Sequence, residues 1–130
     1  MKINMRQFGE IEFDPNIIIK FDSGIFGFEN LRDYLLIKVD DELFYWLCSI
    51  EDLEIAFPLV GLRLIDDTFP QEESSEAFGI VTMNSDIRKI TVNMKAPVYI
   101  NQTVKSGYQK ILDADKYLIR YNLFVDQKEG

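Results

Sequence analysis

The feature that most restricts the fold is a succession of short apolar runs separated by turn-forming residues. Several runs alternate with polar neighbours, as at 90–94, and this is the period of a β-strand. Turn signals such as Asp14-Pro15-Asn16 and Asn84-Ser85-Asp86 separate them. We therefore expect about ten short strands and little helix, in an all-β, antiparallel, barrel-like domain or a sandwich.

The two strongest predicted strands are Leu43–Ile50 and Ile55–Ile65. Both faces of the first are apolar, with Trp46 on one face and Leu47 on the other. Such a strand is covered on both sides, or it lies in a closed barrel with something packed outside. Pro58 lacks an amide donor, so the second strand is predicted to have an edge position or a bulge there.

The remaining pattern predicts a single domain over residues 1–130. Residues 29–33 are expected to form one helical turn, and 66–76 an acidic loop. A last pair of strands is expected at 108–112 and 117–124. Asp126–Gly130 is predicted to be a polar tail.

Composition argues against several kinds of chemistry. The chain has no histidine, the usual general base near neutral pH and the commonest metal ligand. Its single cysteine, Cys48, forms no internal disulfide and is expected to be a small core residue. No cofactor or metal motif is present, and we expect neither. No secretory signal or membrane-spanning run is visible, and sparse cysteine fits a cytoplasmic protein.

Half of the 22 acidic residues lie between Asp40 and Glu76, where Arg63 is the one basic residue. The net charge of −8 is therefore concentrated in the middle of the chain. A negative field of this kind attracts basic partners and repels nucleic-acid phosphates. The alternative is that these acids occupy solvated strand faces and turns.

Two segments have unusual composition. Gly24-Ile25-Phe26-Gly27-Phe28-Glu29 places two phenylalanines in a loop with two glycines, which permit a tight turn. The aromatic side chains either plug a barrel end or project as contacts for a partner. In the second segment, Asn93–Asn101, Pro97 interrupts a strand, and the flanking asparagines are expected to hydrogen-bond the freed backbone.

At these segments the chain resembles the FliW family of flagellar assembly factors. The resemblance also includes Ser49-Ile50-Glu51-Asp52, Ala56-Phe57 and Gly107-Tyr108-Gln109-Lys110-Ile111-Leu112, in the family's order over most of the chain. The chain departs from the family where it has only 66–77 in place of a longer, often partly helical segment. Cys48 stands where glutamine is common, and the usual proline near Gly61 is missing.

The resemblance implies a small β-barrel-like protein without enzymatic activity. Such proteins bind flagellin, the filament subunit, and the RNA-binding translational regulator CsrA. By antagonising CsrA they couple flagellin level to flagellin translation, without contacting nucleic acid or membrane. For the basic regulator the candidate residues are Glu51, Asp52, Glu54, Asp66, Asp67, Glu72 and Glu73. For the helical ends of flagellin they are Phe26, Phe28 and Ile100.

Two alternatives belong to other classes. A carbohydrate-active or other hydrolytic barrel requires two buried carboxylates that face each other, whereas these acids cluster in predicted turns. A nucleic-acid-binding barrel requires basic residues interleaved with aromatic ones. Lys105, Lys110, Lys116 and Arg120 give the C-terminal half only a mild positive bias.

Overall fold

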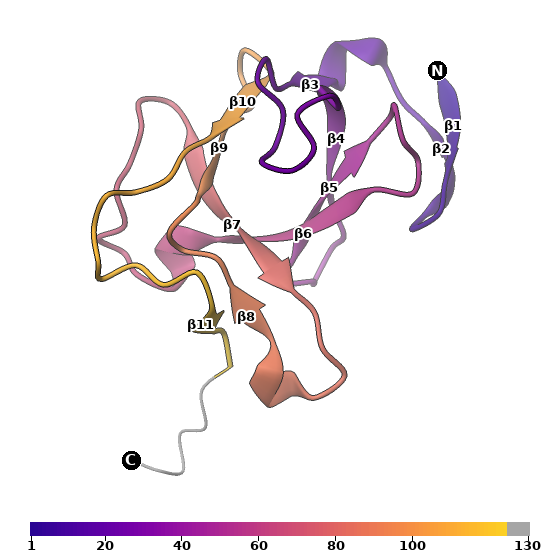
Figure 1. Cartoon of the computed structure of the whole chain (residues 1–130). Coiled ribbons are helices and arrows are strands. Elements are labelled where there is room, and N and C mark those ends of the chain that lie inside the picture. The colour runs from indigo at the N-terminus through magenta and orange to yellow at the C-terminus, as the bar shows by residue number, and fades with distance from the viewer. Residues whose placement is uncertain (125–130) are drawn as a thin grey trace.

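A computed structural model describes residues 1–124 (Figure 1), and the predicted tail Asp126–Gly130 lies outside the described residues. The strands are β1 (Lys2–Met5), β2 (Gly9–Glu12), β3 (Ile19–Lys20), β4 (Asp33–Lys38), β5 (Tyr45–Ser49), β6 (Ala56–Gly61), β7 (Glu76–Thr82), β8 (Thr91–Val92), β9 (Val98–Asn101), β10 (Ser106–Gln109) and β11 (Tyr121–Asn122). Three short 3-10 helices are η1 (Pro15–Ile17), η2 (Leu62–Leu64) and η3 (Ile87–Lys89). Within residues 1–124 there is no α-helix, so the predicted all-β class is confirmed.

Seven strands close into a barrel in the order β7-β6-β5-β4-β3-β10-β9. The ring is completed where β7 pairs with β9, with Phe78 opposite Val98. All neighbours are antiparallel except β10 and β3, which meet in parallel at Ser106 and Lys20. Closure leaves these strands without a free edge. β8 and β11 extend the sheet outward from the end of β7.

β5 is covered on both faces, as its sequence predicts. Leu47 points into the barrel core, where it joins a cluster that includes Phe21, Tyr34 and Phe78. Cys48 points outward into a second cluster with Met5 and Phe13. The β1–β2 hairpin and the segment that follows it supply this outer layer (Figure 1). Burial raises the pKa of the Cys48 thiol to about 11, which fits the expected core role.

The predicted strand Ile55–Ile65 is too long. It ends at Gly61, and Leu62–Leu64 form η2. The Ile65 amide closes this turn by donating a hydrogen bond to the Leu62 carbonyl. Pro58 lies opposite Trp46 of β5, whereas pairing with β7 starts one residue later at Leu59. The proline therefore occupies a part of β6 that β7 does not cover.

Two other predictions are wrong. Residues 29–33 form turns and the start of β4 rather than a helical turn, because the Arg32 carbonyl accepts a hydrogen bond from the Phe21 amide. The expected pair of strands at 108–112 and 117–124 does not form. β10 pairs with β9 and β3, whereas β11 is only two residues long and pairs with β8.

The connections of β6 divide the barrel into two ends. The β5–β6 connection and the β6–β7 connection leave opposite ends of β6, on opposite sides of the view in Figure 1. Because β5 runs antiparallel to β6, the β4–β5 turn lies at the same end as the β6–β7 connection. We call these the first end (β5–β6 connection) and the second end (β4–β5 turn and β6–β7 connection). No helix within residues 1–124 is long and apolar enough to cross a bilayer.

Candidate functional site

The glycine-phenylalanine loop has a fixed backbone. Gly24 has φ +70°, and a Cβ there would lie 2.6 Å from the Glu29 Cα atom. Gly27 has φ +90° and donates its amide to the Glu29 carboxylate at 3.0 Å. This hydrogen bond lowers the pKa of the Glu29 carboxyl. Only glycine adopts both conformations without strain, which explains the two glycines in the motif.

The loop's apolar side chains separate into two roles. Ile25 is buried in the barrel core, and Phe28 packs edge-on against Phe57 with ring centroids 5.2 Å apart. Phe26 is 46% exposed. The plug is therefore formed by Ile25 and Phe28, and Phe26 alone presents its ring to solvent. The barrel-plug alternative therefore holds for Phe28, and contact of Phe26 with a partner stays a prediction.

The two asparagines of the proline segment cap turns. Asn93 Oδ1 accepts the amides of Lys95 and Ala96, at 3.0 and 2.9 Å. Asn101 Oδ1 accepts those of Thr103 and Val104 in the β9–β10 turn. The asparagines thus have the expected backbone-bonding role, although their partners are the turns that follow each of them rather than Pro97.

Gln109 joins the two motifs across the barrel wall. Its Oε1 accepts the Phe26 amide at 2.9 Å, and its Nε2 donates to the Ala96 carbonyl at 2.9 Å. Gln109 therefore holds the Phe26 loop in position relative to the proline segment. Gly107, two residues before Gln109 in the same motif, packs closely against the Phe21 ring, and a Cβ there would lie 2.4 Å from it.

These motifs meet at one cleft of about 390 Å³ at the first end of the barrel. Its lining residues are Ile25, Phe26, Phe57, Ile80, Thr82, Asn93, Ala96, Gln109, Ile119 and Arg120. Phe26 and Ile119 form its exposed apolar rim, with Ile119 61% exposed. The lining thus combines apolar side chains with four polar or charged ones, Thr82, Asn93, Gln109 and Arg120. The exposed apolar rim is suited to an apolar face of a protein segment.

The acidic candidates do not share one surface. Glu51, Asp52 and Glu54 lie in the β5–β6 connection at the first end, whereas Asp66, Asp67, Glu72 and Glu73 lie in the β6–β7 connection at the second end. The concentration of acids in sequence is thus divided in space. Strand β6 separates the two groups by about 20 Å.

At the first end the acids are engaged within the chain. Glu51 accepts the amides of Arg32 and Asp33, at 2.6 and 2.9 Å, and these bonds lower the pKa of its carboxyl. Asp52 accepts the Glu54 amide, and Glu54 pairs with Arg6 at 2.9 Å. Their negative charge is therefore partly used to order the β5–β6 turn.

At the second end the engagement is uneven. Asp66 accepts the Thr68 hydroxyl and amide, which lower its pKa. Glu72 accepts the Tyr108 hydroxyl at 2.5 Å and pairs with Lys110 at 3.2 Å. Those two bonds lower the pKa of the Glu72 carboxyl. Within residues 1–124, the side chains of Asp67 and Glu73 make no hydrogen bond or ion pair.

Of the apolar candidates, Ile100 is unsuitable for contact with a partner. Its side chain is 1% exposed and belongs to the barrel core. Sequence reasoning instead missed Ile119, which it placed in a strand although the segment forms turns and bends. It also missed Leu64, which η2 leaves 74% exposed. No periodicity distinguishes these residues from core positions.

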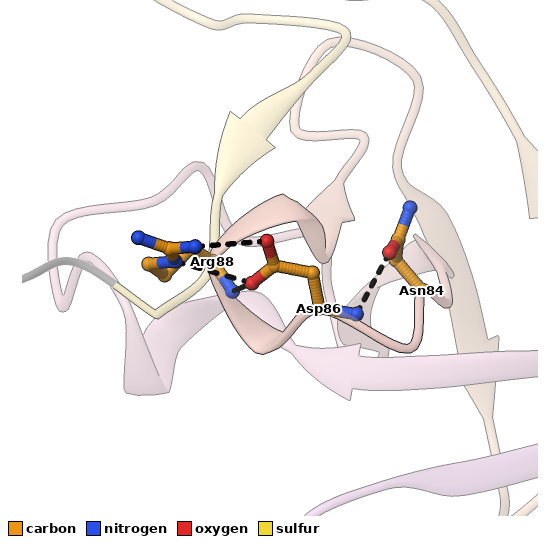
Figure 2. Close-up of polar contacts among 3 residues, drawn as sticks. All are labelled: Asn84, Asp86 and Arg88. Atoms are coloured by element: carbon orange, nitrogen blue, oxygen red, sulfur yellow. Dashed lines mark hydrogen bonds and ion pairs between the residues drawn. The ribbon is translucent and has the colours of Figure 1, made fainter.

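The polar cluster in the β7–β8 connection has a structural role. Figure 2 shows Asn84 Oδ1 accepting the Asp86 amide and Asp86 bonded to both the amide and guanidinium of Arg88. These bonds cap η3, and the Arg88 side chain is the first cause of the lowered pKa of the Asp86 carboxyl. The cluster is exposed and faces no cavity among those described, so it carries no separate site.

Comparison with known proteins agrees with the motif analysis. The chain matches the family described as FliW protein over residues 2–70 and 62–123. A flagellar assembly factor FliW from Caldicellulosiruptor saccharolyticus is 38% identical over 136 residues, covering 94% of this chain and 90% of the relative. The one from Thermoanaerobacter pseudethanolicus is 35% identical over 146 residues, covering 100% and 97%. A crystal structure of a flagellar assembly factor FliW shares the fold, with TM-score 0.87 at 24% identity over 98% of this chain and 99% of that one.

Proposed function

Because this chain belongs to the FliW family of flagellar assembly factors, we propose that it is a non-enzymatic cytoplasmic chaperone and regulator that binds two proteins. One partner is flagellin. The other is the RNA-binding translational regulator CsrA, which the chain antagonises. In this proposal the exchange between the two partners couples flagellin level to flagellin translation.

The observation that carries the proposal is the cleft beside Phe26. An aromatic ring stands exposed on a loop whose backbone is held by two side chains, because Gln109 accepts the Phe26 amide and Glu29 accepts the Gly27 amide. Exposed aromatic residues held in place are typical centres of protein interfaces, because little entropy is lost when they are covered. With Ile119 on the opposite rim, the cleft fits an apolar helical face, the kind of segment expected at the ends of flagellin.

The net negative charge supports the second partner. A net charge of −8 favours association with a basic protein and disfavours phosphate close to the bound complex. Exposed charges act mainly on the association rate and lose effect as salt is added. Binding to CsrA is therefore expected to be salt-sensitive, whereas binding to flagellin through an apolar cleft is expected to depend little on salt.

Replacement of Phe26 by Ser tests the flagellin site. We expect the Kd for monomeric flagellin, measured by calorimetry, to rise by about tenfold or more, because a central aromatic contact is lost. Val104→Ser is the matched control, since Val104 is 65% exposed in the β9–β10 turn and lies away from the cleft. Equal flagellin affinity of F26S and V104S, with both variants folded, contradicts the proposed site.

The hydrolytic alternative gains no support. Within residues 1–124 no Asp or Glu residue is buried, and the buried hydroxyl groups are those of Ser49 and of core tyrosines, so no two carboxylates face each other in a buried cleft. The Ser49 hydroxyl accepts hydrogen bonds from the amides of Glu51 and Asp52. Its burial is therefore explained by its role in the β5–β6 turn.

A further inference from the structure

A second surface lies at the other end of the barrel, between η2 and the start of β7. It is a groove of about 450 Å³, lined by Gly61, Arg63, Leu64, Gln71, Ser74, Ser75, Glu76 and Ala77. Leu64 stands at its lip with 74% of its surface exposed, more than any other large hydrophobic residue within 1–124. Gly61 contributes no side chain to the groove, and a Cβ there would lie 3.7 Å from both the Leu64 side chain and the Glu76 carboxylate.

The groove is bordered by carboxylates that the chain leaves available. The side chains of Asp67, Glu73 and Glu76 accept no hydrogen bond from any residue within 1–124. The β4–β5 turn at the same end adds Asp40, Asp41 and Glu42, which are also exposed. Glu76 lines the groove together with Leu64, and Asp67 and Glu73 lie in the β6–β7 connection that supplies most of its other lining residues.

The basic groups at this end are mostly engaged. Arg63 is held by the Gln71 side chain and the Asp67 carbonyl. Lys110 pairs with Glu72, and Lys38 donates to the carbonyls of Val39 and Glu42. Lys116 lies near Asp66, whose carboxyl is also bonded by Thr68. Arg63 lines the groove and keeps its positive charge, because both of its partners are neutral. With Asp66 and Glu72 added to the six acids above, eight carboxylates stand against these four cations, so the net charge of the second end is negative.

We propose that this groove is the docking site for a basic protein segment that covers Leu64 with an apolar side chain and places Lys or Arg beside Asp67, Glu73 and Glu76. The proposal rests on the proposed function, in which a basic regulator is bound. It assigns that regulator to the second end of the barrel, away from the Phe26 cleft. Charge complementarity selects the occupant, because a neutral apolar segment leaves Asp67, Glu73 and Glu76 without partners.

The test compares three variants in binding to CsrA by stopped-flow and surface plasmon resonance at low and high salt. D67N/E73Q/E76Q is expected to lower the association rate about tenfold at low salt and to flatten its salt dependence. L64S is expected to raise the dissociation rate by about tenfold, because an apolar contact is lost. The control E10Q/E12Q/D22N makes the same change in net charge at exposed sites on and near the β1–β2 hairpin, and it is expected to behave like the wild type within about twofold.

The results distinguish a failure of the groove assignment from a failure of the proposed function. If the wild type binds CsrA but both groove variants bind equally well, the groove assignment is wrong and the proposed function stands. If the control slows association as much as the groove triple variant, only net charge matters and the groove is again excluded. If the wild type does not bind CsrA, both fail. Light scattering that finds a wild-type dimer which L64S converts to a monomer also overturns the proposal, because a second copy then covers the groove.

Discussion

At the scale of the residue, two buried tyrosines differ in what their hydroxyl groups contact. The Tyr34 side chain is fully buried, and its hydroxyl has no partner among the described residues, whereas the Tyr99 hydroxyl donates to the Pro70 carbonyl at 3.0 Å. Burial, with Glu51 as a lesser cause, raises the pKa of Tyr34 to about 12. We predict that Tyr34→Phe leaves the free energy of unfolding unchanged or raises it by up to about 1 kcal/mol, whereas Tyr99→Phe lowers it by about 1 kcal/mol. Urea unfolding measures both, and a clear loss in Y34F contradicts the prediction.

At the scale of the element, short polar turns hold the segments that form the cleft. Asn93 satisfies two partly buried amides with one oxygen, whereas Asp86 at the exposed turn of Figure 2 accepts one amide and the guanidinium of Arg88. We predict that Asn93→Ala lowers the free energy of unfolding by about 1–2 kcal/mol, because two amides lose their acceptor. Asn93→Asp keeps an oxygen in the same place and is expected to recover most of that loss. Equal stability of N93A and the wild type in chemical denaturation means that the turn does not depend on this side chain.

In the molecule as a whole, the barrel depends on β10, which links β3 in the N-terminal part of the chain to β9. Gly107 of β10 packs against the Phe21 ring, so an added Cβ collides with a core side chain at 2.4 Å. We predict that Gly107→Ala lowers the free energy of unfolding by about 1–3 kcal/mol, as overpacking does in other cores. The matched control is Gly61→Ala, whose Cβ has no neighbour closer than 3.7 Å and which is expected to change stability by less than about 0.5 kcal/mol. Thermal and urea unfolding of the pair check this, and a G107A variant as stable as G61A shows that the closure tolerates a larger residue.

Local sequence patterns were enough to predict the class of fold and most of its strands. Apolar alternation and turn residues are local signals, and they correctly predicted an all-β chain with β5 covered on both faces. The ordered motifs were also sufficient to indicate the family. They carried the backbone requirements of Gly24, Gly27 and Asn93, which depend on neighbours a few residues away.

Which side chains share a surface could be seen only once the chain was folded. The eleven acids between Asp40 and Glu76 lie at two ends of the barrel, because β6 separates the connections that carry them. Ile100 is buried while Ile119 and Leu64 are exposed, although all three are apolar residues in apolar surroundings. The physical reason is that exposure depends on strand pairing and barrel closure between segments far apart in the chain, and a local pattern contains no information about that register.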